Sequence, residues 1–377
     1  MKKIKIVYIV STLKNCGPVQ VLLSIVKNLD KKLFDVFIIT LSKEPQHSLI
    51  DEFVKEGSDV SQVKLSRLKG IFFLKRNTSK IINNINPDLI HSHGIRSDYL
   101  CSIFSKKYST VSTIHNFPNK DYLLRYGKFL GNIMLYFHMK ILKKISQPVS
   151  ISKSISKHLK NRYSLNTSVV YNGIDSKKFF SIPLSAKLKL RDKLKIPADR
   201  VVFLSVGHLT QLKDPITTIK AFMISEVEKS LLIFVGDGEL LEECKTLSNS
   251  SDNIKFVGRQ TNVEDYYQAS DVFISSSLTE GFGLVVTEAI SCGLFCILSD
   301  IPAFEEILTY FNKSDVGVLF KNNDSVALSN KLKQAIELLH NKTDCSQIIK
   351  VHFSSQAMSD KYSELYQSMI NDKVHIT

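Results

Sequence analysis

The sequence lacks the features that mark secreted, zinc-binding or membrane-spanning proteins. Its six cysteines are scattered with no C-x-x-C pair, which favours reduced thiols and no zinc site. No stretch approaches the roughly 18 uninterrupted apolar residues of a membrane-spanning helix. The apolar start at residues 4–10 is interrupted by Lys5, so we interpret it as a first buried strand. These absences indicate a globular cytoplasmic protein.

The glycine fingerprint of dinucleotide-binding proteins is also missing. In place of G-x-G-x-x-G, the loop at residues 11–18 keeps only Gly17, and Pro18 follows it. Proline suits the first turn of a helix but has no amide to donate. The loop is therefore a plausible but weakened anion-binding site.

Acidic residues are absent from residues 122–174, although the chain as a whole has a net charge of +14. The basic residues of this segment are Arg125, Lys128, Lys140, Lys143, Lys144, Lys153, Lys157, Lys160 and Arg162. Apolar side chains alternate with them, so the segment could lie on an anionic membrane surface. A core-packed helix with a solvated lysine face explains the pattern equally well. Nucleic-acid binding is disfavoured, because the aromatic residues show no stacking module.

The order of apolar runs predicts two α/β domains. A chain of 377 residues exceeds what one hydrophobic core usually serves. The expected strands are 4–10, 34–40, 88–93, 110–115, 147–151 and 168–171, then 201–206, 231–235, 253–257, 271–275, 294–299 and 316–320. Helical patterns separate most of them, which is typical of parallel sheets covered on both faces. We expect two doubly wound, Rossmann-like domains, residues 1–182 and 183–353, facing a central cleft. A helix at 354–377 would cross back to the first domain.

The second half of the chain contains the most informative segment, Leu278-Thr279-Glu280-Gly281-Phe282-Gly283-Leu284-Val285-Val286-Thr287-Glu288. The glycines favour a turn, and a helix is expected from Leu284. Two carboxylates eight residues apart suit two ends of one bound molecule, with a phosphate near the helix start. Glu288 falls on an apolar helical stripe and needs a partner, either ligand hydroxyls or a buried Lys or Ser. The alternative for Glu280 is a solvent-exposed loop residue without function.

Other candidates follow expected strands, where ligands of open parallel sheets bind. They are His91, His93 and His115 in the first half, and Gly207, His208 and Lys213 in the second. A structural hydrogen bond is the favoured interpretation of His93, whereas a functional role is favoured for His115. Lys213 could be an ordinary solvated lysine, but with the helix start at Leu284 it could hold a diphosphate. Asp237-Gly238-Glu239 resembles a metal-binding motif, yet we interpret it as a turn and expect no metal.

These segments resemble glycosyltransferase family 4, whose members are retaining enzymes of the GT-B fold. The specific match is the E-x7-E motif from Glu280 to Glu288, with Ser205-Val206-Gly207, Lys213 and Phe256-Val257-Gly258 around it. His91-Ser92-His93-Gly94 and Thr113-Ile114-His115 match in the first half. His208 stands where the family usually has arginine, so a permanent cation is replaced by a titratable group.

The resemblance implies a role for each matching residue. Glu288 would bind the donor's ribose, and Glu280 would contact the transferred sugar. The residues that would hold the donor besides Glu288 are Gly17, Gly207, His208, Lys213, Arg259, Phe282, Gly283 and Leu284. His115 would lie near the reacting anomeric carbon and, with Glu280, forms the expected catalytic pair.

We therefore expect an enzyme that moves a sugar from a nucleoside-diphosphate sugar to an acceptor hydroxyl, with retention and without a cofactor or metal. The acceptor would be a lipid-linked saccharide in surface polysaccharide assembly, at the cytoplasmic face of a membrane. The alternatives are a nucleotide-sugar 2-epimerase of the same fold, which needs no acceptor, and a non-catalytic two-lobed sugar-binding protein.

Overall fold

The structure, a computed structural model, describes residues 3–64, 67–248, 251–311, 313–338 and 343–374. The chain forms two compact units. The first unit comprises Met1–Gly173 and Ser355–Thr377, and the second comprises Ile174–Ser354.

The first unit contains a parallel sheet in the strand order β3-β2-β1-β4-β5-β6-β7. The strands are β1 (Ile4–Val10), β2 (Phe34–Thr40), β3 (Asp59–Gln62), β4 (Leu89–His93), β5 (Ser109–Ile114), β6 (Gln147–Ser150) and β7 (Ser168–Val169). The central strands are continuous buried runs because helices cover both faces of a parallel sheet. Strand order reverses between β1 and β4, whose registers pair Val10 with His93.

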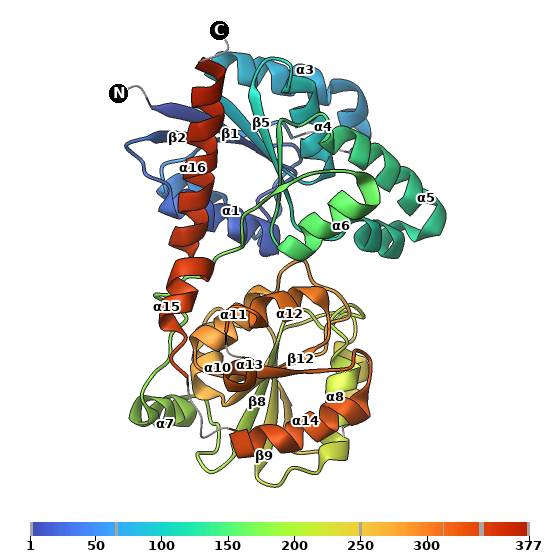
Figure 1. Cartoon of the computed structure of the whole chain (residues 1–377), viewed down its shortest axis with the longest axis vertical. Helices are drawn as coiled ribbons and strands as arrows, with labels where there is room; N and C mark the ends of the chain where they lie inside the picture. The colour runs from blue at the N-terminus through green and yellow to red at the C-terminus, as the bar shows by residue number, and fades with distance from the viewer. Residues whose placement is uncertain (1–2, 65–66, 249–250, 312, 339–342, 375–377) are drawn as a thin grey trace. The chain divides into compact units, whose positions relative to one another are not determined.

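The helices of the first unit connect these strands. They are α1 (Gly17–Asn28), α2 (Ile50–Lys55), α3 (Arg67–Ile85), α4 (Ile95–Phe104), α5 (Pro118–Leu142), α6 (Lys153–Tyr163) and the C-terminal α16 (Ser355–Val374). Helix α16 packs along α1, far from it in sequence (Figure 1). Four α16 hydroxyls form hydrogen bonds with the rest of the unit: Ser355 and Ser359 bond to Ser24 and the Ile25 carbonyl of α1, and Tyr362 and Tyr366 bond to strand residues.

The second unit contains a parallel sheet in the order β10-β9-β8-β11-β12-β13. Its strands are β8 (Val201–Val206), β9 (Ser230–Val235), β10 (Ile254–Phe256), β11 (Val272–Ser275), β12 (Phe295–Ser299) and β13 (Gly317–Phe320). Its helices are α7 (Leu184–Lys193), α8 (Pro215–Ser225), α9 (Leu241–Ser248), α10 (Val263–Ala269), α11 (Leu284–Ser291), α12 (Pro302–Leu308), α13 (Lys313–Val316), α14 (Ser325–Leu338), α15 (Ser346–Ile348) and the π-helical turn η1 (Ile349–Phe353). Here the strand order reverses between β8 and β11.

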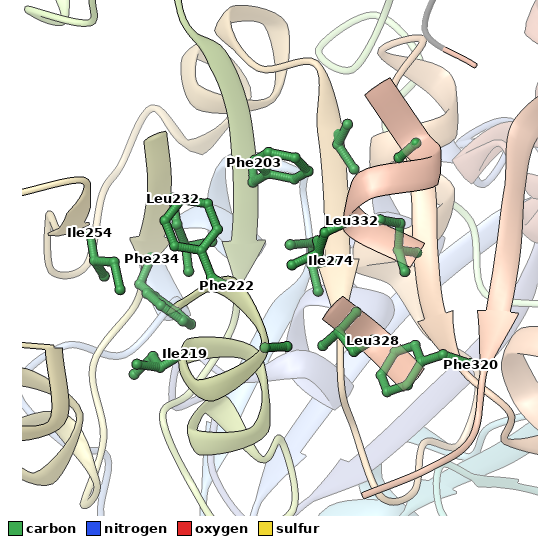
Figure 2. Packing of buried hydrophobic residues seen from close by; sticks show 14 of the residues in the cluster. Phe203, Ile219, Phe222, Leu232, Phe234, Ile254, Ile274, Phe320, Leu328 and Leu332 are labelled. Carbon is green, nitrogen blue, oxygen red and sulfur yellow. The ribbon is translucent and has the colours of Figure 1, made fainter. Parts of the chain in front are cut away.

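The core of the second unit joins α8 and α14 to one face of this sheet. Phe222 of α8 packs edge-to-face on Phe203 of β8, with ring centroids 5.8 Å apart. Leu328 and Leu332 of α14 lie in the same cluster, together with Ile274 of β11 (Figure 2). Alternate residues of each strand enter this core, as expected where side chains alternate between sheet faces. The core holds the strand ends, and the loops that follow them, in fixed positions.

The boundary between the units lies earlier than the expected 182/183. The amide of Ile174 donates to the Phe353 carbonyl at 2.8 Å, and Ser291 Oγ donates to the Phe179 carbonyl at 2.7 Å. Residues from 174 onward are thereby attached to the second unit, whose last residue is Ser354.

Several elements were not predicted: strand β3, helix α7, the short helices α13 and α15, and the turn η1. Strand β3 is short and has a single large apolar residue, Val60, so its period-2 pattern is weak. Helix α7 occupies the Lys-rich stretch that was expected to be a linker. Its Lys187 and Arg191 are buried because both bind Asp271, at 2.5 and 2.6 Å. The basic composition of this stretch predicts a linker, but ion pairs with Asp271, just before β11, make it a helix packed on the second unit.

Candidate functional site

Backbone contacts fix the loops at the carboxyl ends of β8, β9 and β10. Gly236, after β9, has φ +148°, and a Cβ atom there would lie 1.8 Å from the Gly207 carbonyl oxygen. The Gly207 amide donates to the Val235 carbonyl, and the Gly236 amide donates to the Gly258 carbonyl. The three strand ends therefore form a close-packed row of glycine turns.

Two predicted cationic donor-binding residues lie on this row. His208 follows Gly207 and is exposed, with Nδ1 3.2 Å from the Asp237 carbonyl oxygen. Arg259 follows Gly258, is exposed, and has no side-chain partner among the described residues. The Asp237 side chain stabilises the turn that contains it, because Oδ1 accepts a hydrogen bond from the Gly238 amide at 2.8 Å. Within the described residues no group of three or more His, Cys, Asp or Glu side chains is arranged to hold a metal ion.

Lys213 and Glu280 meet where the strand order reverses. Lys213 follows β8, Glu280 follows β11, and Lys213 Nζ forms an ion pair with Glu280 Oε1. Ser277 Oγ donates to the same oxygen at 3.0 Å, whereas Oε2 has no hydrogen-bond partner among the described residues. Leu278 N donates to the Leu212 carbonyl at 2.8 Å and ties the two loops together. The alternative interpretation of Glu280 as a solvent-exposed loop residue is wrong, because its side chain is only 15% exposed.

The turn between Glu280 and α11 is anchored by aromatic packing. Phe282 is buried and its ring lies 5.8 Å from that of Phe353. Gly283 has φ +106°, and a Cβ atom there would lie 2.8 Å from the Phe304 ring. Glycine is required here for both reasons. Helix α11 then starts at Leu284, whose amide, like that of Val285, has no acceptor within the helix. These amides suit an anion.

Glu288 lies one turn into α11, and its hydrogen-bond partner is a tyrosine. Tyr267 of α10, fully buried, donates its hydroxyl to Glu288 Oε2 at 2.8 Å. Burial raises the pKa of Glu288 to about 7, although the Tyr267 hydrogen bond and the charge of Lys178 oppose the rise. Sequence reasoning proposed Lys or Ser as protein partners and missed Tyr267.

In the first unit, Gly17 begins α1 in the loop after β1. Its backbone does not have a positive φ, and a Cβ atom would meet nothing within 4 Å. The fold of the unit therefore does not itself demand glycine at this position. Glu44 holds the preceding loop by accepting from the Leu13 amide at 2.9 Å.

The histidines at the ends of β4 and β5 form a connected cluster. His93 Nδ1 lies 2.8 Å from His115 Nε2, and the two rings stack with centroids 5.1 Å apart. Burial lowers the pKa of His115 to about 4, with Asp98 opposing the shift. His115 is thus a neutral ring at pH 7, paired with a histidine that sequence reasoning treated as structural.

Comparisons with known proteins agree over nearly the whole chain. Residues 186–351 match a family model described as glycosyl transferases group 1, and residues 16–178 match one described as Glycosyltransferase Family 4. An O-antigen biosynthesis glycosyltransferase, WclY of Escherichia coli, is 27% identical over 98% of this chain and 99% of its own.

A second relative and a solved structure extend the comparison. The relative, from Escherichia coli, is UDP-Gal:alpha-D-GlcNAc-diphosphoundecaprenol alpha-1,3-galactosyltransferase, 26% identical over 98% of both chains. The structure is that of Anabaena HepE in complex with UDP and glucose. It is similar with a TM-score of 0.80 and 18% identity, over 97% of this chain and 100% of that one.

Proposed function

The chain belongs to glycosyltransferase family 4 and has the GT-B fold of two parallel-sheet α/β domains, and we propose that it is a retaining enzyme using a nucleoside-diphosphate sugar. The observation that carries this proposal is the order of charged and hydrogen-bonding groups along the segment from Glu280 to Glu288. A cation-paired carboxylate, free helix amides and a second, hydroxyl-bonded carboxylate follow each other from Glu280 to Glu288.

Each of these groups matches one part of the donor. Glu288 accepts the ribose hydroxyls, and the first amides of α11 receive the diphosphate. On the neighbouring loops, Arg259 adds a permanent positive charge and His208 adds a polar ring, and Glu280 binds hydroxyls of the transferred sugar. Gly17, at the start of α1, stays a predicted donor-binding residue. No resident cofactor or metal takes part in this scheme.

The ion pair between Lys213 and Glu280 fits this assignment. Without donor, the two charges compensate each other in a partly buried position. When the donor binds, the diphosphate becomes the partner of Lys213, and sugar hydroxyls become the partners of Glu280. Both side chains are thus held ready in the charged forms that the donor needs.

The chemical step separates negative charge onto the leaving diphosphate. Because that charge grows in the transition state, Lys213 and the amides at the start of α11 stabilise the transition state more than the ground state. No second carboxylate beside Glu280 serves as a nucleophile in this scheme. We propose same-face attack by the acceptor hydroxyl, in which the bond from the anomeric carbon to the diphosphate oxygen breaks and the bond to the acceptor oxygen forms. The acceptor proton passes to the departing diphosphate oxygen, and His115 orients the reacting groups. An NMR time course that showed the inverted anomer as first product would exclude retention.

The proposed acceptor is a lipid-linked saccharide, and helix α5 supports it. This helix is kinked at Gly127, which has φ +73°. It exposes several large apolar side chains, and Phe129 is 78% exposed. The others are Leu124, Tyr126, Leu130, Ile133, Tyr136 and Phe137. No acidic residue follows Asp121 in this helix, so an anionic lipid surface is complementary to it.

Vesicle sedimentation tests the membrane part of the proposal. The protein should sediment with phosphatidylglycerol-containing vesicles and much less with pure phosphatidylcholine vesicles, and salt should weaken binding. Replacing Phe129 and Leu130 by Ser should reduce binding severalfold, whereas V326S, at an exposed valine of α14 in the second unit, should not. Equal sedimentation with both lipids would exclude an anionic surface as partner. None of the helices in the described residues meets the length and hydropathy needed to span a bilayer.

A donor panel tests the activity itself. UDP-, GDP- and ADP-sugars, with CMP-sugar as the monophosphate control, are compared by thermal shift and then by nucleotide release. The account predicts stabilisation by one diphosphate sugar and release that rises when a lipid-linked saccharide is added. Conversion of the donor sugar without acceptor would indicate the epimerase, and binding without any release would indicate a sugar-binding protein.

A further inference from the structure

His91 and His93, two residues apart in β4, lie on the same face of the strand. Hydrogen bonds hold the ring of His91 in a fixed orientation. His91 Nδ1 lies 2.7 Å from the Tyr366 hydroxyl, and His91 Nε2 lies 2.8 Å from Thr113 Oγ1. Tyr366 also contacts the Tyr8 hydroxyl at 3.0 Å. Both nitrogens of His91 are therefore engaged, and its ring cannot turn without losing hydrogen bonds.

His93 packs on the ring of His91 and forms a hydrogen bond with His115. The His91 and His93 rings lie 4.5 Å apart, and the only hydrogen bond of His93 among the described residues joins its Nδ1 to His115 Nε2. The other nitrogen, Nε2, is buried without a partner in a side chain that is 8% exposed.

The pair shares a single proton between its rings. Burial lowers the pKa of His93 well below its ordinary value, with His91 and His115 acting in the same direction. His115 is likewise neutral at pH 7. Two neutral imidazoles joined by one hydrogen bond have one N–H between them, which belongs either to His93 Nδ1 or to His115 Nε2.

The unpartnered nitrogen distinguishes these two arrangements. If His115 Nε2 carried the shared proton, His93 would carry its own on Nε2, as a buried N–H without an acceptor. Orphaned N–H groups are rare in protein interiors, whereas an uncovered acceptor position is tolerated more often. The favourable arrangement puts the shared proton on His93 Nδ1.

We propose that His93 is a positioning residue that holds His115 in the tautomer protonated at Nδ1. In this tautomer His115 presents an N–H donor at the nitrogen that has no partner among the described residues. His115 then donates a hydrogen bond to an oxygen of the substrates and does not act as a general base. The catalytic role of this hydrogen bond rests on the proposed function. The tautomer of His115 follows from the hydrogen bonds alone and does not depend on that function.

Nitrogen-15 NMR on histidine-labelled protein measures the tautomer directly. Two-bond correlations from the ring protons distinguish Nδ1–H from Nε2–H, and H115Q identifies the His115 signals. The expected result is Nδ1–H for His115 at pH 7.5 in the protein without donor. A His115 signal of the Nε2–H form would overturn the proposal, whether or not the protein transfers sugar.

Two substitutions then test the positioning role. In H93N the amide nitrogen takes the place of Nδ1 and can still donate to His115, whereas H93L removes the donor at similar volume. With the donor sugar that gives nucleotide release, H93L should lower kcat on the order of 10- to 100-fold with KM nearly unchanged. H93N should restore most of the loss.

The matched control is Y108F. Tyr108 is buried in the same unit and its hydroxyl has no hydrogen-bond partner among the described residues, so this change should leave kcat unaltered. Equal activity of H93L and wild type, or equal loss in H93N and H93L with unchanged melting temperatures, would contradict the proposal. A folded protein with the expected tautomer but no transfer from any donor would count against the proposed function only.

Discussion

Each unit has a polar cluster beside the point where the strand order of its sheet reverses, but the side chains differ: an ion pair in the second unit and a pair of histidines in the first. In the second unit, Lys213 and Glu280 follow the strands on either side of the reversal and form an ion pair. In the first unit, His93 ends the strand beside the reversal and pairs with His115 after the next strand, as two neutral rings.

The difference follows from burial. The Lys213 and Glu280 side chains remain 30% and 15% exposed, so both charges are kept and are available to a charged ligand. The histidines are surrounded by tyrosine, threonine and strand residues, where a charge would be costly and a directional N–H is retained. The second unit is therefore suited to hold a nucleoside diphosphate, and the first unit to orient a neutral hydroxyl.

The largest expected effect is that of E280A. It removes the proposed ligand of the transferred sugar and leaves Lys213 without its partner, so kcat/KM should fall on the order of 100- to 1,000-fold. The control is E242A, which breaks the exposed ion pair of Glu242 with Lys245. Initial rates with the identified donor, with circular dichroism to monitor folding, provide the measurement. Activity of E280A within threefold of wild type would remove Glu280 from the site.

A smaller loss is expected for H115Q in the first unit. Because the ring is neutral, its contribution is a directed hydrogen bond, and we expect kcat to fall on the order of 100-fold. The loss should be the same at low and high salt, unlike the loss caused by K213Q, which should vary with salt. H47Q, at an exposed histidine of the same unit, is the control. A loss in H115Q that depends on salt would show that the ring acts as a cation.

Much of the fold was predictable because its strands are buried runs. The ranges expected for β1, β2 and β8 match the structure. Strand β3 and helix α7 were missed because their sequences are polar, and the burial of Lys187 depends on Asp271, which is distant in sequence. The predicted fold and family are confirmed, whereas the assigned roles of the site residues stay predictions.

The partners of site residues were less predictable than the residues themselves. The spacing of Glu280 and Glu288 indicated that both carboxylates belong to the site. No local sequence pattern predicts the hydrogen bond of Tyr267 to Glu288 or that between His93 and His115. These pairs form between helices or strands whose relative positions depend on the whole sheet.

An effect of intermediate size is expected on the pH dependence of stability, because the pKa of Glu288 is raised. Its pKa is about 7 in the folded chain and about 4.5 without burial, so the folded state holds a proton that the unfolded chain has lost. Stability should therefore decline as pH rises from about 4.5 through about 7, and E288Q should lack this decline. Thermal melts of both proteins at pH 5 and pH 8 measure the difference. An identical pH dependence in both would contradict a raised pKa.

Donor binding should show the opposite trend at the same residue. The ionised carboxylate is the better acceptor for ribose hydroxyls, so affinity for the nucleotide sugar should increase as pH rises through about 7. The increase should be absent in E288Q. In Y267F, which lacks the hydrogen bond that lowers the pKa, it should shift to higher pH. Calorimetric titrations at several pH values provide the test.

The smallest expected effect is that of H208R. A permanent cation on the loop after β8 should raise the rate severalfold at pH 8, where an ordinary histidine is neutral, and less at pH 6. The ratio of H208R to wild-type rates, measured across this range, isolates the residue from other titrating groups. A ratio that does not change with pH would show that His208 does not contact the diphosphate.

A crystal structure with the intact nucleotide sugar would test the central claim most directly. The account predicts ribose hydroxyls on the Glu288 carboxylate, the diphosphate at the first turn of α11 beside Lys213, and sugar hydroxyls on Glu280. A nucleotide bound elsewhere, or one that leaves Lys213 paired with Glu280 and Glu288 bonded to Tyr267 alone, would contradict it.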